Sequence, residues 1–409
     1  MKIALIHDWL TRLGGAERVL IALHKIFPEA PIYTLFHDQK FTSEYLPRAK
    51  IIPSFLQKIP NIKKLHPWFK ILMPSAVESL DLSGFDLIIS SSHEFSHGVL
   101  VKQKTSHICF YHSPSRIIWD RAHEYLSDFK ERGRGRFKLS LIKLGQHFLR
   151  LWDYTSSQRP DIILANSRHV AERIKKYYGR EAKVVYPPIS FPMDSLGLRN
   201  RESSIFQPNQ IDLGKIGTPY FLIVSQLYPH KNIDLAIEAF KNLPNLNLLT
   251  IGDGPKKKNL ESRIKNYGNV KLLGFVPDSE LPYYYQNCLA YLICNEEDFG
   301  LSPVEAMSFG KPVLALRRGG AIETVLEGIT GEFFDPIRGK NTLRALAASN
   351  GVNELVKAVQ NISEKIKNGR YDSKTIKKHS EKFSFERFKK RILDLVDNLD
   401  YTGKTRKTI

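Results

Sequence analysis

Short apolar runs alternate with helix-like segments along most of this chain, and that rhythm limits the fold more than any other feature of the sequence. In the first half, the runs predicted as strands are residues 2–6, 86–90, 107–112, 161–167 and 183–187. In the second half, they are residues 221–225, 247–251, 270–275, 288–294 and 313–316. Strands that alternate with helices pair in parallel, because each strand must return to the same end of the sheet. The alternation therefore predicts an α/β fold with parallel, doubly wound sheets.

The alternation is interrupted once, and this interruption divides the chain. Residues 190–218 are polar, contain Gly and Pro, and show no periodicity, which is typical of a linker or an insertion. A length of 409 residues is also too great for one ordinary core and suits two domains. We therefore predict one Rossmann-like domain at 1–189 and another at 219–382, followed by a C-terminal segment at 383–409. Two such domains facing each other would place ligands in the cleft, at the carboxyl ends of the strands.

The charge balance is strongly basic. With 61 Lys and Arg against 42 Asp and Glu, the formal net charge is +19, and such a protein attracts nucleic acids, anionic lipid surfaces or phosphorylated substrates. The sequence has no RNA- or DNA-binding signature, so nucleic acid is not a predicted partner.

Three scattered cysteines are too few for a disulfide framework, and no Cys/His spacing is typical of a metal site. The apolar run near the start is too short for a signal peptide, and no run approaches the roughly 20 residues of a membrane span.

Two basic stretches are candidates for contact with a membrane surface. Residues 51–73 interleave lysines with aromatic and aliphatic side chains, a mixture that suits a membrane interface. Prolines within this stretch argue against one continuous helix, and packing onto its own domain as an acceptor-side lobe is the slightly favoured alternative. The second stretch is a basic, glycine-containing loop at 132–136, followed by an amphipathic helix at 137–152. Its lysines and arginines also fit a simple solvated helix face.

A predicted strand–turn–helix is the strongest local candidate for a phosphate site. An apolar run at 289–294 is followed by NEEDFGLSPVEAMSFG. Ser302, Pro303 and Glu305 suit the N-cap, first and third positions of a helix. The start of a helix offers backbone N–H groups and a positive dipole end of about half a unit charge, both of which favour an anion. Ser-x-x-Glu is also a capping box that needs no ligand, and on local evidence both interpretations stay open.

Six blocks of the chain resemble, in order, the signature blocks of family-4 retaining glycosyltransferases. They are SQLYPHKNIDLAIEAF, IGDGP, GFVPDSELPYYYQNC, EEDFGLSPVEAMSFGKPVLAL, GGAIETVLEGITGEFFDP and FSFERF. In the first half, GGAERV, YHSPSRIIWD, IILANS and VVYPP resemble the bacterial members that build surface polysaccharides, often with mannose. The resemblance spans nearly the whole chain and implies the GT-B fold, in which two Rossmann-like domains face each other and a C-terminal helix crosses back to the first. The segment FSFERFKKRILDLVDNL, with Ser384 at its N-cap, is the predicted crossing helix.

The reaction that this resemblance implies moves a sugar from a nucleotide diphosphate to a hydroxyl and keeps the anomeric configuration. The departing diphosphate gains negative charge that must be stabilised. No Asp-x-Asp metal motif occurs in the chain, so we expect cations and amides, and no metal, to meet this charge. Lys231 occupies the family's cationic position, whereas Gln226 replaces the usual neighbouring arginine. Arg116 and Arg318 are the candidates to substitute for that arginine.

The resemblance also implies roles for single residues. The predicted catalytic residues are His112 and Glu297, both near the donor sugar, and Lys231. The predicted donor-binding residues are Gly15, Gln226, Lys231, Val276, Gly300, Leu301, Ser302 and Glu305. Among these, Glu305 would hold the ribose hydroxyls, and Gly15 would touch the phosphate. Asp8 and Arg116 are predicted on the acceptor side. Outside the family context, Lys231 would be interpreted as a surface lysine and His112 as a structural histidine.

These inferences predict one function and leave several alternatives. The predicted protein is a retaining, metal-independent glycosyltransferase that moves mannose from GDP-mannose to a lipid-linked or polysaccharide acceptor in cell-envelope glycan synthesis. It is expected to need no other cofactor, to be cytoplasmic and to lie peripherally on the inner membrane face. The alternatives are the same reaction with a UDP-sugar, a sugar-nucleotide epimerase, and a non-catalytic basic protein that binds membrane or nucleic acid. The Glu-x7-Glu block argues against the epimerase, and intact Glu297, Glu305 and Lys231 argue against a non-catalytic protein.

Overall fold

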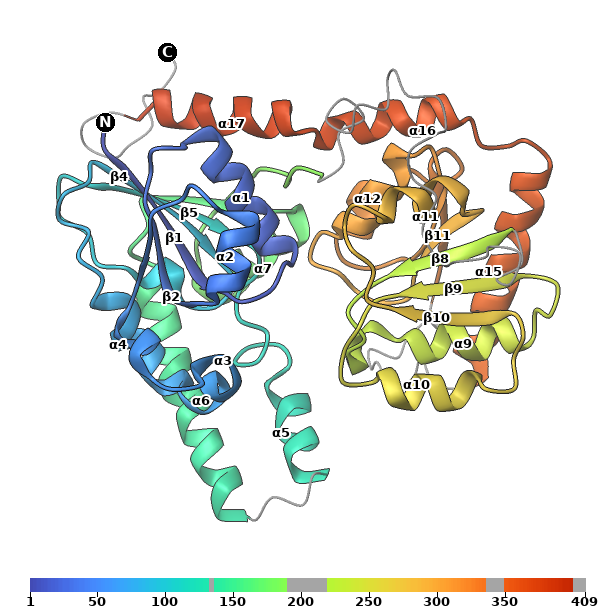
Figure 1. The fold of residues 1–409 in the computed structure, drawn as a ribbon, viewed down its shortest axis with the longest axis horizontal. Coiled ribbons are helices and arrows are strands. Elements are labelled where there is room, and N and C mark those ends of the chain that lie inside the picture. Colours follow the sequence, from blue (N-terminus) through green and yellow to red (C-terminus); the bar gives the residue numbers. More distant parts are fainter. Residues whose placement is uncertain (132–135, 190–218, 336–348, 400–409) are drawn as a thin grey trace. The chain divides into compact units, whose positions relative to one another are not determined.

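The structure is a computed structural model that describes residues 1–131, 136–189, 219–335 and 349–399 (Figure 1). The chain divides into two compact units. The first is Met1–Pro188 together with Phe385–Ile409, and the second is Ile189–Ser384. The predicted linker at 190–218, most of the basic loop at 132–136 and the end of the C-terminal tail lie outside the described residues.

The first unit is built on one parallel sheet. Its strands are β1 (Ile3–Leu10), β2 (Ile32–His37), β3 (Ile51–Pro53), β4 (Leu87–Ser92), β5 (Ser106–Tyr111), β6 (Ile162–Ala165) and β7 (Lys183–Val184). They lie in the order β3-β2-β1-β4-β5-β6-β7, and all neighbouring strands are parallel. The strand order reverses between β1 and β4. In open α/β sheets, ligands bind at such a reversal, beyond the carboxyl ends of the strands.

Helices cover both faces of this sheet (Figure 1). The helices of this unit are α1 (Gly15–Ile26), α2 (Gln39–Tyr45), α3 (Ile62–Leu65), α4 (Met73–Glu78), α5 (Ala122–Glu131), α6 (Arg136–Ser156), α7 (Arg168–Tyr178) and α17 (Phe385–Asp397), of which α5 projects away from the sheet. Short 3-10 turns are η1 (Phe55–Lys58), η2 (His66–Trp68), η3 (Lys70–Leu72) and η4 (Ser96–Gly98). Because successive strand side chains point to opposite faces, Leu5 and Ile89 join the core that contains α1 and α17, whereas Ile6 and Ile88 join the core that contains α4.

The C-terminal helix α17 belongs to the first unit. Phe388, Ile392 and Val396 recur every four residues, so they share one face of the helix, and all three are buried in the same core as Val19 of α1. The ring of Phe388 lies 6.0 Å from that of Phe110 in β5, measured between centroids. The prediction that the chain returns to its first domain at the C-terminus is confirmed.

The second unit repeats the architecture without repeating the sequence. Its strands are β8 (Tyr220–Val224), β9 (Asn247–Ile251), β10 (Val270–Gly274), β11 (Ala290–Ile293), β12 (Val313–Leu316) and β13 (Gly331–Phe334), in the parallel order β10-β9-β8-β11-β12-β13. Its helices are η5 (Pro229–Lys231), α9 (Ile233–Lys241), α10 (Lys257–Ile264), α11 (Leu281–Asn287), α12 (Leu301–Ser308), α13 (Ala321–Thr324), α15 (Ser349–Lys367), α16 (Ser373–Ser380) and η6 (Glu381–Phe383). Strands β8, β9 and β11 pack with α9 and α15 in one core.

The predicted alternation and the parallel sheets are confirmed, but the strand list was incomplete. Strands β2, β3 and β13 were not predicted. β3 has three residues and ends in Pro53, and β13 begins at Gly331, so neither carries a strong strand signal. Strand β1 is longer than predicted, because β2 pairs beside it as far as Leu10. His7 and Asp8 therefore lie inside the strand and not after its end.

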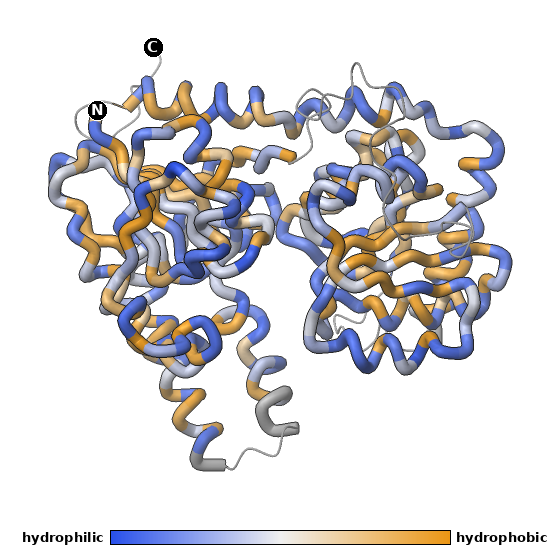
Figure 2. Tube along the Cα trace, in the orientation of Figure 1, coloured by the Kyte–Doolittle hydropathy of each residue, from blue (hydrophilic) through white to orange (hydrophobic). Residues whose placement is uncertain are grey.

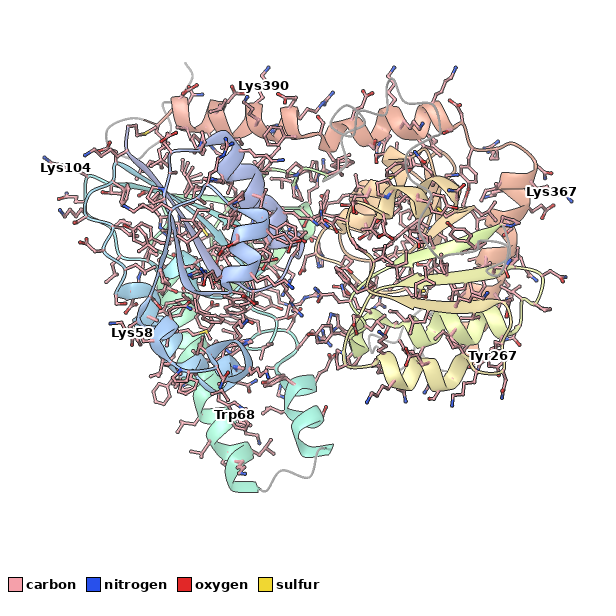
Figure 3. The ribbon with its side chains drawn as sticks, in the orientation of Figure 1. Lys58, Trp68, Lys104, Tyr267, Lys367 and Lys390 are labelled. Carbon is pink, nitrogen blue, oxygen red and sulfur yellow. The ribbon has the colours of Figure 1, made fainter. Side chains whose placement is uncertain are left out.

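Residues 51–73 form β3 and a series of short helical turns, as the prolines in this stretch predicted. Leu56 and Ile62 are buried in the core of the first unit, but Trp68 and Ile71 are 64% and 51% exposed. Figure 2 shows hydrophobic residues concentrated along the strands and recurring along α6, and Figure 3 shows Lys58 and Trp68 at the outside of the unit. Within the described parts of the chain, every helix is too short or too polar to span a bilayer.

Candidate active site

Asp8 organises the loop that follows β4 in the first unit. Its side chain is fully buried, and its carboxylate accepts backbone N–H groups from four consecutive residues, His93 (2.7 Å), Glu94 (3.1 Å), Phe95 (2.6 Å) and Ser96 (2.7 Å). This geometry corrects the prediction that Asp8 faces the acceptor. The strand continues past Asp8, so the side chain points into the protein, where it holds the loop at 93–96.

His93 forms an ion pair with the same carboxylate. Its Nδ1 lies 2.8 Å from Asp8 Oδ2, and its side chain keeps 25% of its surface exposed. Burial alone would lower the pKa of His93, but the Asp8 carboxylate outweighs it and raises that pKa to about 9. Burial alone would raise the pKa of Asp8, but His93 holds it well below its usual range. An imidazolium is therefore held at the carboxyl edge of the sheet at neutral pH.

A second group of polar side chains lies beside this pair. Ser91 Oγ at the end of β4 lies 2.8 Å from His112 Nε2 and 3.3 Å from His7 Nδ1. His7 Nε2 in turn lies 3.6 Å from a carboxylate oxygen of Glu17 in α1. Burial, together with the neighbouring His7 and His93, holds the pKa of His112 well below its ordinary value. His112 is therefore a neutral hydrogen-bonding group at neutral pH.

The glycine pair after β1 makes room for Glu17. Gly14 is the N-cap of α1, and a Cβ atom added to it would lie 2.8 Å from Glu17 Oε2. Gly15, the predicted phosphate contact, is the first residue of the helix.

Arg116, predicted on the acceptor side, lies with its Nε 3.7 Å from a carboxylate oxygen of Asp120, which also pairs with Arg173. Arg116 is thus part of a local ion-pair group.

In the second unit, the loops at the carboxyl ends of β8 and β9 interlock. Gly252 has a φ of +144°, and a Cβ atom there would lie 1.8 Å from the carbonyl oxygen of Ser225. The Leu227 N–H donates to Asp253 O at 2.9 Å. Gln226 is held between these contacts. Val276, another predicted donor-binding residue, is buried just after β10.

Lys231 and Glu297 form an ion pair beside this loop. Lys231 ends η5, and its ammonium group contacts Glu297 Oε1, which also accepts a hydrogen bond from Asn295 Nδ2 at 2.9 Å. Burial would raise the pKa of Glu297, but the positive charge of Lys231 outweighs it and lowers that pKa. Both side chains keep some exposed surface, 16% for Lys231 and 27% for Glu297. The two predicted catalytic residues of this unit therefore lie together as an ion pair.

Helix α12 begins four residues after Glu297, at Leu301, and not after Ser302 as the sequence predicted. The helix is Leu301–Ser308, and its N-cap is Gly300, which has a φ of +87° and no capping side chain. Ser302 therefore lies in the first turn and Glu305 one turn further on, so the predicted capping box is wrong. Glycine takes the cap because this positive φ disfavours every residue with a Cβ atom. The N–H groups of the first turn have no capping side chain, which is compatible with an anion.

Glu305 is buried within its own unit. The residue is only 3% exposed, and its carboxylate accepts a hydrogen bond from the Tyr285 hydroxyl at 3.0 Å. Each carboxylate oxygen can accept more than one hydrogen bond, so this contact is compatible with further donors such as ribose hydroxyls. Glu305 lies on the same short helix as Leu301 and Ser302, as the predicted donor site requires.

The loop after β12 supports the one that carries Glu297. Gly319 has a φ of +62°, and a Cβ atom there would lie 2.2 Å from Glu297 O. The Gly320 N–H donates to the same oxygen at 2.9 Å. Arg318, a candidate to replace the missing arginine, lies directly before this turn. The two glycines let the loops approach closely enough to fix the position of Glu297.

Several polar residues at these edges were not selected from the sequence. They are His93, Glu94, Glu17 and Asn295. A signal was available for His93 and Glu94, because they directly follow a buried strand at the ligand-binding edge of a parallel sheet. Nothing local indicates the contact of Glu17 with His7. Among the described residues, no group of three or more His, Cys, Asp and Glu side chains has the arrangement of a metal site.

Two family models match the chain, one in each half. The model for Glycosyltransferase Family 4 matches residues 13–191, and that for Glycosyl transferases group 1 matches residues 207–349. The alpha-1,3/1,6-mannosyltransferase ALG2 of Dictyostelium discoideum is 24% identical over 455 residues, which cover 98% of each chain. The GDP-mannose-dependent alpha-(1-6)-phosphatidylinositol monomannoside mannosyltransferase of Mycolicibacterium smegmatis is 27% identical over 190 residues, which cover 43% of this chain and 49% of that one.

Solved structures share the fold. The crystal structure of Anabaena Alr3699/HepE in complex with UDP and glucose superposes with a TM-score of 0.63 at 20% identity, covering 98% of this chain and all of that one. The predicted parallel α/β halves and the family blocks thus agree with both comparisons. The chain therefore carries a family-4-type and a group-1 glycosyltransferase domain, has the GT-B fold, and is a hexosyltransferase.

Proposed function

We propose that this enzyme is a retaining, metal-independent mannosyltransferase that uses GDP-mannose. The observation that carries the proposal is the Lys231–Glu297 ion pair beside the start of α12. A cation and backbone N–H groups in one place are what a departing nucleoside diphosphate needs. Because Glu297 already holds Lys231 in place, the ammonium group need not be reoriented as negative charge develops on the departing diphosphate.

The second unit supplies the donor site in this proposal. Lys231 and the first-turn amides of α12 bind the diphosphate, Glu305 accepts the ribose hydroxyls, and Glu297 lies near the sugar. With Gln226 in place of the usual arginine, Lys231 carries a larger share of the phosphate charge. We propose retention without a protein nucleophile, with the acceptor hydroxyl attacking from the leaving-group side and giving its proton to the donor phosphate.

The first unit supplies the sugar and acceptor contacts. Neutral His112 hydrogen-bonds a donor-sugar hydroxyl, and the loop at 93–96, held by Asp8, presents His93 to the acceptor. Asp8 is thus a positioning residue in this proposal. The acceptor is a lipid-linked or polysaccharide hydroxyl, and the enzyme works peripherally at a membrane surface, which the net charge of +19 and the exposed Trp68 favour.

Mannose and GDP are supported by two relatives named as mannosyltransferases, one of them GDP-mannose-dependent. The second candidate is a UDP-sugar donor, which is supported by the similar HepE fold solved with UDP and glucose. The experiment that separates them is a donor panel of GDP-mannose, UDP-glucose and UDP-N-acetylglucosamine, in which release of nucleoside diphosphate and the anomeric configuration of the product are measured. Release only from UDP-sugars would refute GDP-mannose, and an inverted product would refute retention.

A further inference from the structure

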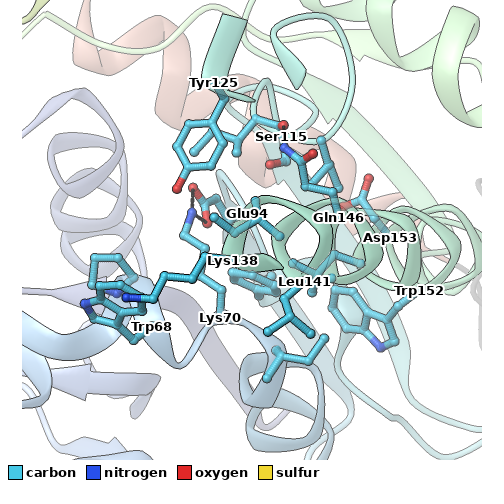
Figure 4. Close-up of a pocket in the computed structure, with 18 residues that line it drawn as sticks. Trp68, Lys70, Glu94, Ser115, Tyr125, Lys138, Leu141, Gln146, Trp152 and Asp153 are labelled. Carbon is cyan, nitrogen blue, oxygen red and sulfur yellow. Dashed lines mark hydrogen bonds and ion pairs between the residues drawn. The ribbon is translucent and has the colours of Figure 1, made fainter. Parts of the chain in front are cut away.

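The first unit contains an apolar pocket that the proposed chemistry does not use. It has a volume of about 690 Å³ and lies between the turns around Trp68 and Ile71, the start of the loop after β4, and helices α5 and α6 (Figure 4). Leu141, Leu149 and Trp152 of α6 form much of its wall. This volume is within the usual range for a small-molecule pocket, roughly 300–1,000 Å³.

Four polar side chains of the wall, those of Lys70, Glu94, Gln146 and Trp152, already have hydrogen-bond partners within the protein. Lys70 Nζ binds both carboxylate oxygens of Glu94, at 2.8 and 2.6 Å. Gln146 Nε2 donates to Ile117 O at 3.0 Å, and Trp152 Nε1 donates to Glu78 at 2.8 Å. A hydrocarbon chain would therefore leave none of these groups without a partner, whereas a polar ligand would have to break internal bonds to be satisfied.

The exposed part of the pocket wall has a different character. Trp68, Ile71 and Leu141 line the pocket and are each at least half exposed, so they lie at its mouth. Lys138, also exposed, adds a positive charge there. The pocket thus combines an apolar interior with a basic mouth, which is complementary to a hydrocarbon chain that carries an anionic head group.

The outer face of α6 continues this apolar surface. Leu141, Leu144, Phe148 and Leu151 recur at intervals of three and four residues, and each is 53% to 55% exposed. Such spacing places them on one stripe of the helix. An amphiphilic ligand that arrives from a bilayer would meet this stripe before it reaches the pocket.

We propose that this pocket binds the hydrocarbon chain of the acceptor, a long-chain phosphate or diphosphate lipid whose head group lies near Lys138. This inference rests on the proposed function, because it assigns the pocket to the acceptor of that reaction. It also gives the first unit a specific means of selecting a lipid-linked acceptor over a free glycan.

Gly145 offers a direct test, because it lines the pocket and a Cβ atom added to it would meet no other atom within 4 Å. Gly145→Phe fills the pocket, Gly145→Leu fills it in part, and Gly145→Ala is the matched control that also favours the helix. Leu144→Glu/Phe148→Glu changes the outer stripe without touching the pocket wall. The probe is decyl phosphate below its micelle concentration, titrated by calorimetry into the full-length protein, with thermal unfolding as the check on folding.

Decyl phosphate should bind the wild type and Gly145→Ala equally, and Gly145→Phe should weaken binding by about tenfold or more, as when a buried anchor loses its pocket. Gly145→Leu should be intermediate. The proposal is overturned if the wild type does not bind, if Gly145→Phe and Gly145→Leu both bind as the wild type does, or if only the stripe variant loses binding. Propyl phosphate binding as tightly would refute the role of the chain, and decyltrimethylammonium binding as tightly would refute the anionic head group.

The titration is independent of turnover, so it also separates this proposal from the proposed function. Binding of decyl phosphate without transfer from any donor would contradict the transferase assignment and leave the pocket intact. Transfer to a soluble glycan, with no binding of the probe, would contradict the pocket alone. Gly145→Phe should bind GDP as tightly as the wild type does, because Gly145 lines the proposed acceptor pocket and is not among the residues proposed to bind the donor.

Discussion

At the scale of single residues, each unit has one ion pair that sets the local electrostatics at the carboxyl edge of its sheet. Asp8 with His93 lies in the first unit, and Lys231 with Glu297 lies in the second. In each pair, the opposite charge outweighs the effect of burial on the pKa of the carboxylate, so both carboxylates are ionised. The pairs have different proposed tasks, since one positions a loop and the other meets the charge of a leaving group.

Replacing Lys231 tests the second task. Lys231→Ala should lower kcat/KM for the donor by about a hundredfold to a thousandfold, the usual effect of losing one stabilising group at a developing negative charge. Lys256→Ala is a matched control, because Lys256 is also a partly exposed lysine paired with a carboxylate, that of Asp234, in the same unit. Equal rates for Lys231→Ala and Lys256→Ala, with both variants folded, would show that Lys231 does not act on the leaving group.

Replacing Asp8 tests the first task through stability. Asp8→Asn leaves His93 without its charge partner, and breaking a buried pair in this way should cost about 3–5 kcal/mol of unfolding free energy. The raised pKa of His93 means that its stabilising effect is complete below pH 6.5 and is lost as pH rises through about 9. The lowered pKa of Asp8 means that its effect is present above about pH 4 and is lost as pH falls further.

Urea unfolding of wild type and Asp8→Asn over this pH range is the corresponding measurement. The difference in unfolding free energy between the two proteins should be largest between about pH 4 and 6.5, and should shrink towards pH 9. If the difference in unfolding free energy stayed constant across this pH range, the charges of Asp8 and His93 would not be the cause of the destabilisation.

At the scale of elements, glycines determine how closely the loops of the second unit approach one another. Gly319 and Gly328 both have positive φ angles, of 62° and 76°. A Cβ atom on Gly319 would collide with Glu297 O at 2.2 Å, whereas one on Gly328 would meet nothing within 4 Å. The two positions therefore share the backbone strain and differ only in the contact.

This pair allows a controlled prediction. Gly328→Ala should cost only the backbone strain, about 1–2 kcal/mol, and should leave donor affinity unchanged. Gly319→Ala should cost more and should also weaken nucleotide binding, because it displaces the loop that carries Glu297. Thermal unfolding and calorimetric titration with GDP and UDP measure the two effects. If both variants bind nucleotide like the wild type, the loop contact has no role in donor binding.

At the scale of the whole molecule, the absence of Asp-x-Asp from the sequence predicts how the enzyme responds to chelation. Transfer should be unaffected by EDTA, since Lys231 and the amides of α12 are proposed to meet the phosphate charge. Initial rates with and without EDTA, followed by addition of Mg²⁺ or Mn²⁺, are the measurement. Loss of activity that either metal restores would show that the leaving group depends on a cation from solution.

Membrane binding is the second prediction at this scale. Lys58 and Lys64 are exposed and belong to the same stretch, residues 51–73, as the exposed Trp68. Each basic residue near an anionic bilayer contributes about 1 kcal/mol to the binding free energy, and salt weakens this contribution. Lys58→Glu/Lys64→Glu should reduce cosedimentation with anionic vesicles at low salt, and Trp68→Ala should reduce the part that persists at high salt. Lys63 is less suited to this test, because it pairs with Asp38.

The matched control for that experiment is Lys102→Glu/Lys104→Glu, because Lys104 lies well away from Trp68 on the same unit (Figure 3). It changes the net charge equally and should change binding less. No binding of the wild type to anionic vesicles at low salt would refute the membrane proposal. An equal loss in both double variants would show that only the overall charge matters.

The sequence by itself determined the fold class of this protein and supplied the residues that are proposed to bind the donor. Strand–helix alternation, amphipathic spacing in α17 and the signature blocks around Lys231 and Glu297 are local patterns, and the physical preferences behind them act within a few residues. The limits of β1, the cap of α12 and the strands β2, β3 and β13 depended on pairing and backbone geometry that local preference does not fix.

Only the tertiary structure decided what the buried polar residues do. Asp8 binds a loop 85 to 88 residues away along the chain, and Glu17 meets His7 because helix α1 packs back onto β1. The same is true of the apolar pocket, whose walls come from turns and helices that are distant in sequence. Such contacts join residues that are far apart in the sequence and form only when the whole chain folds. A pattern of neighbouring residues therefore does not predict them.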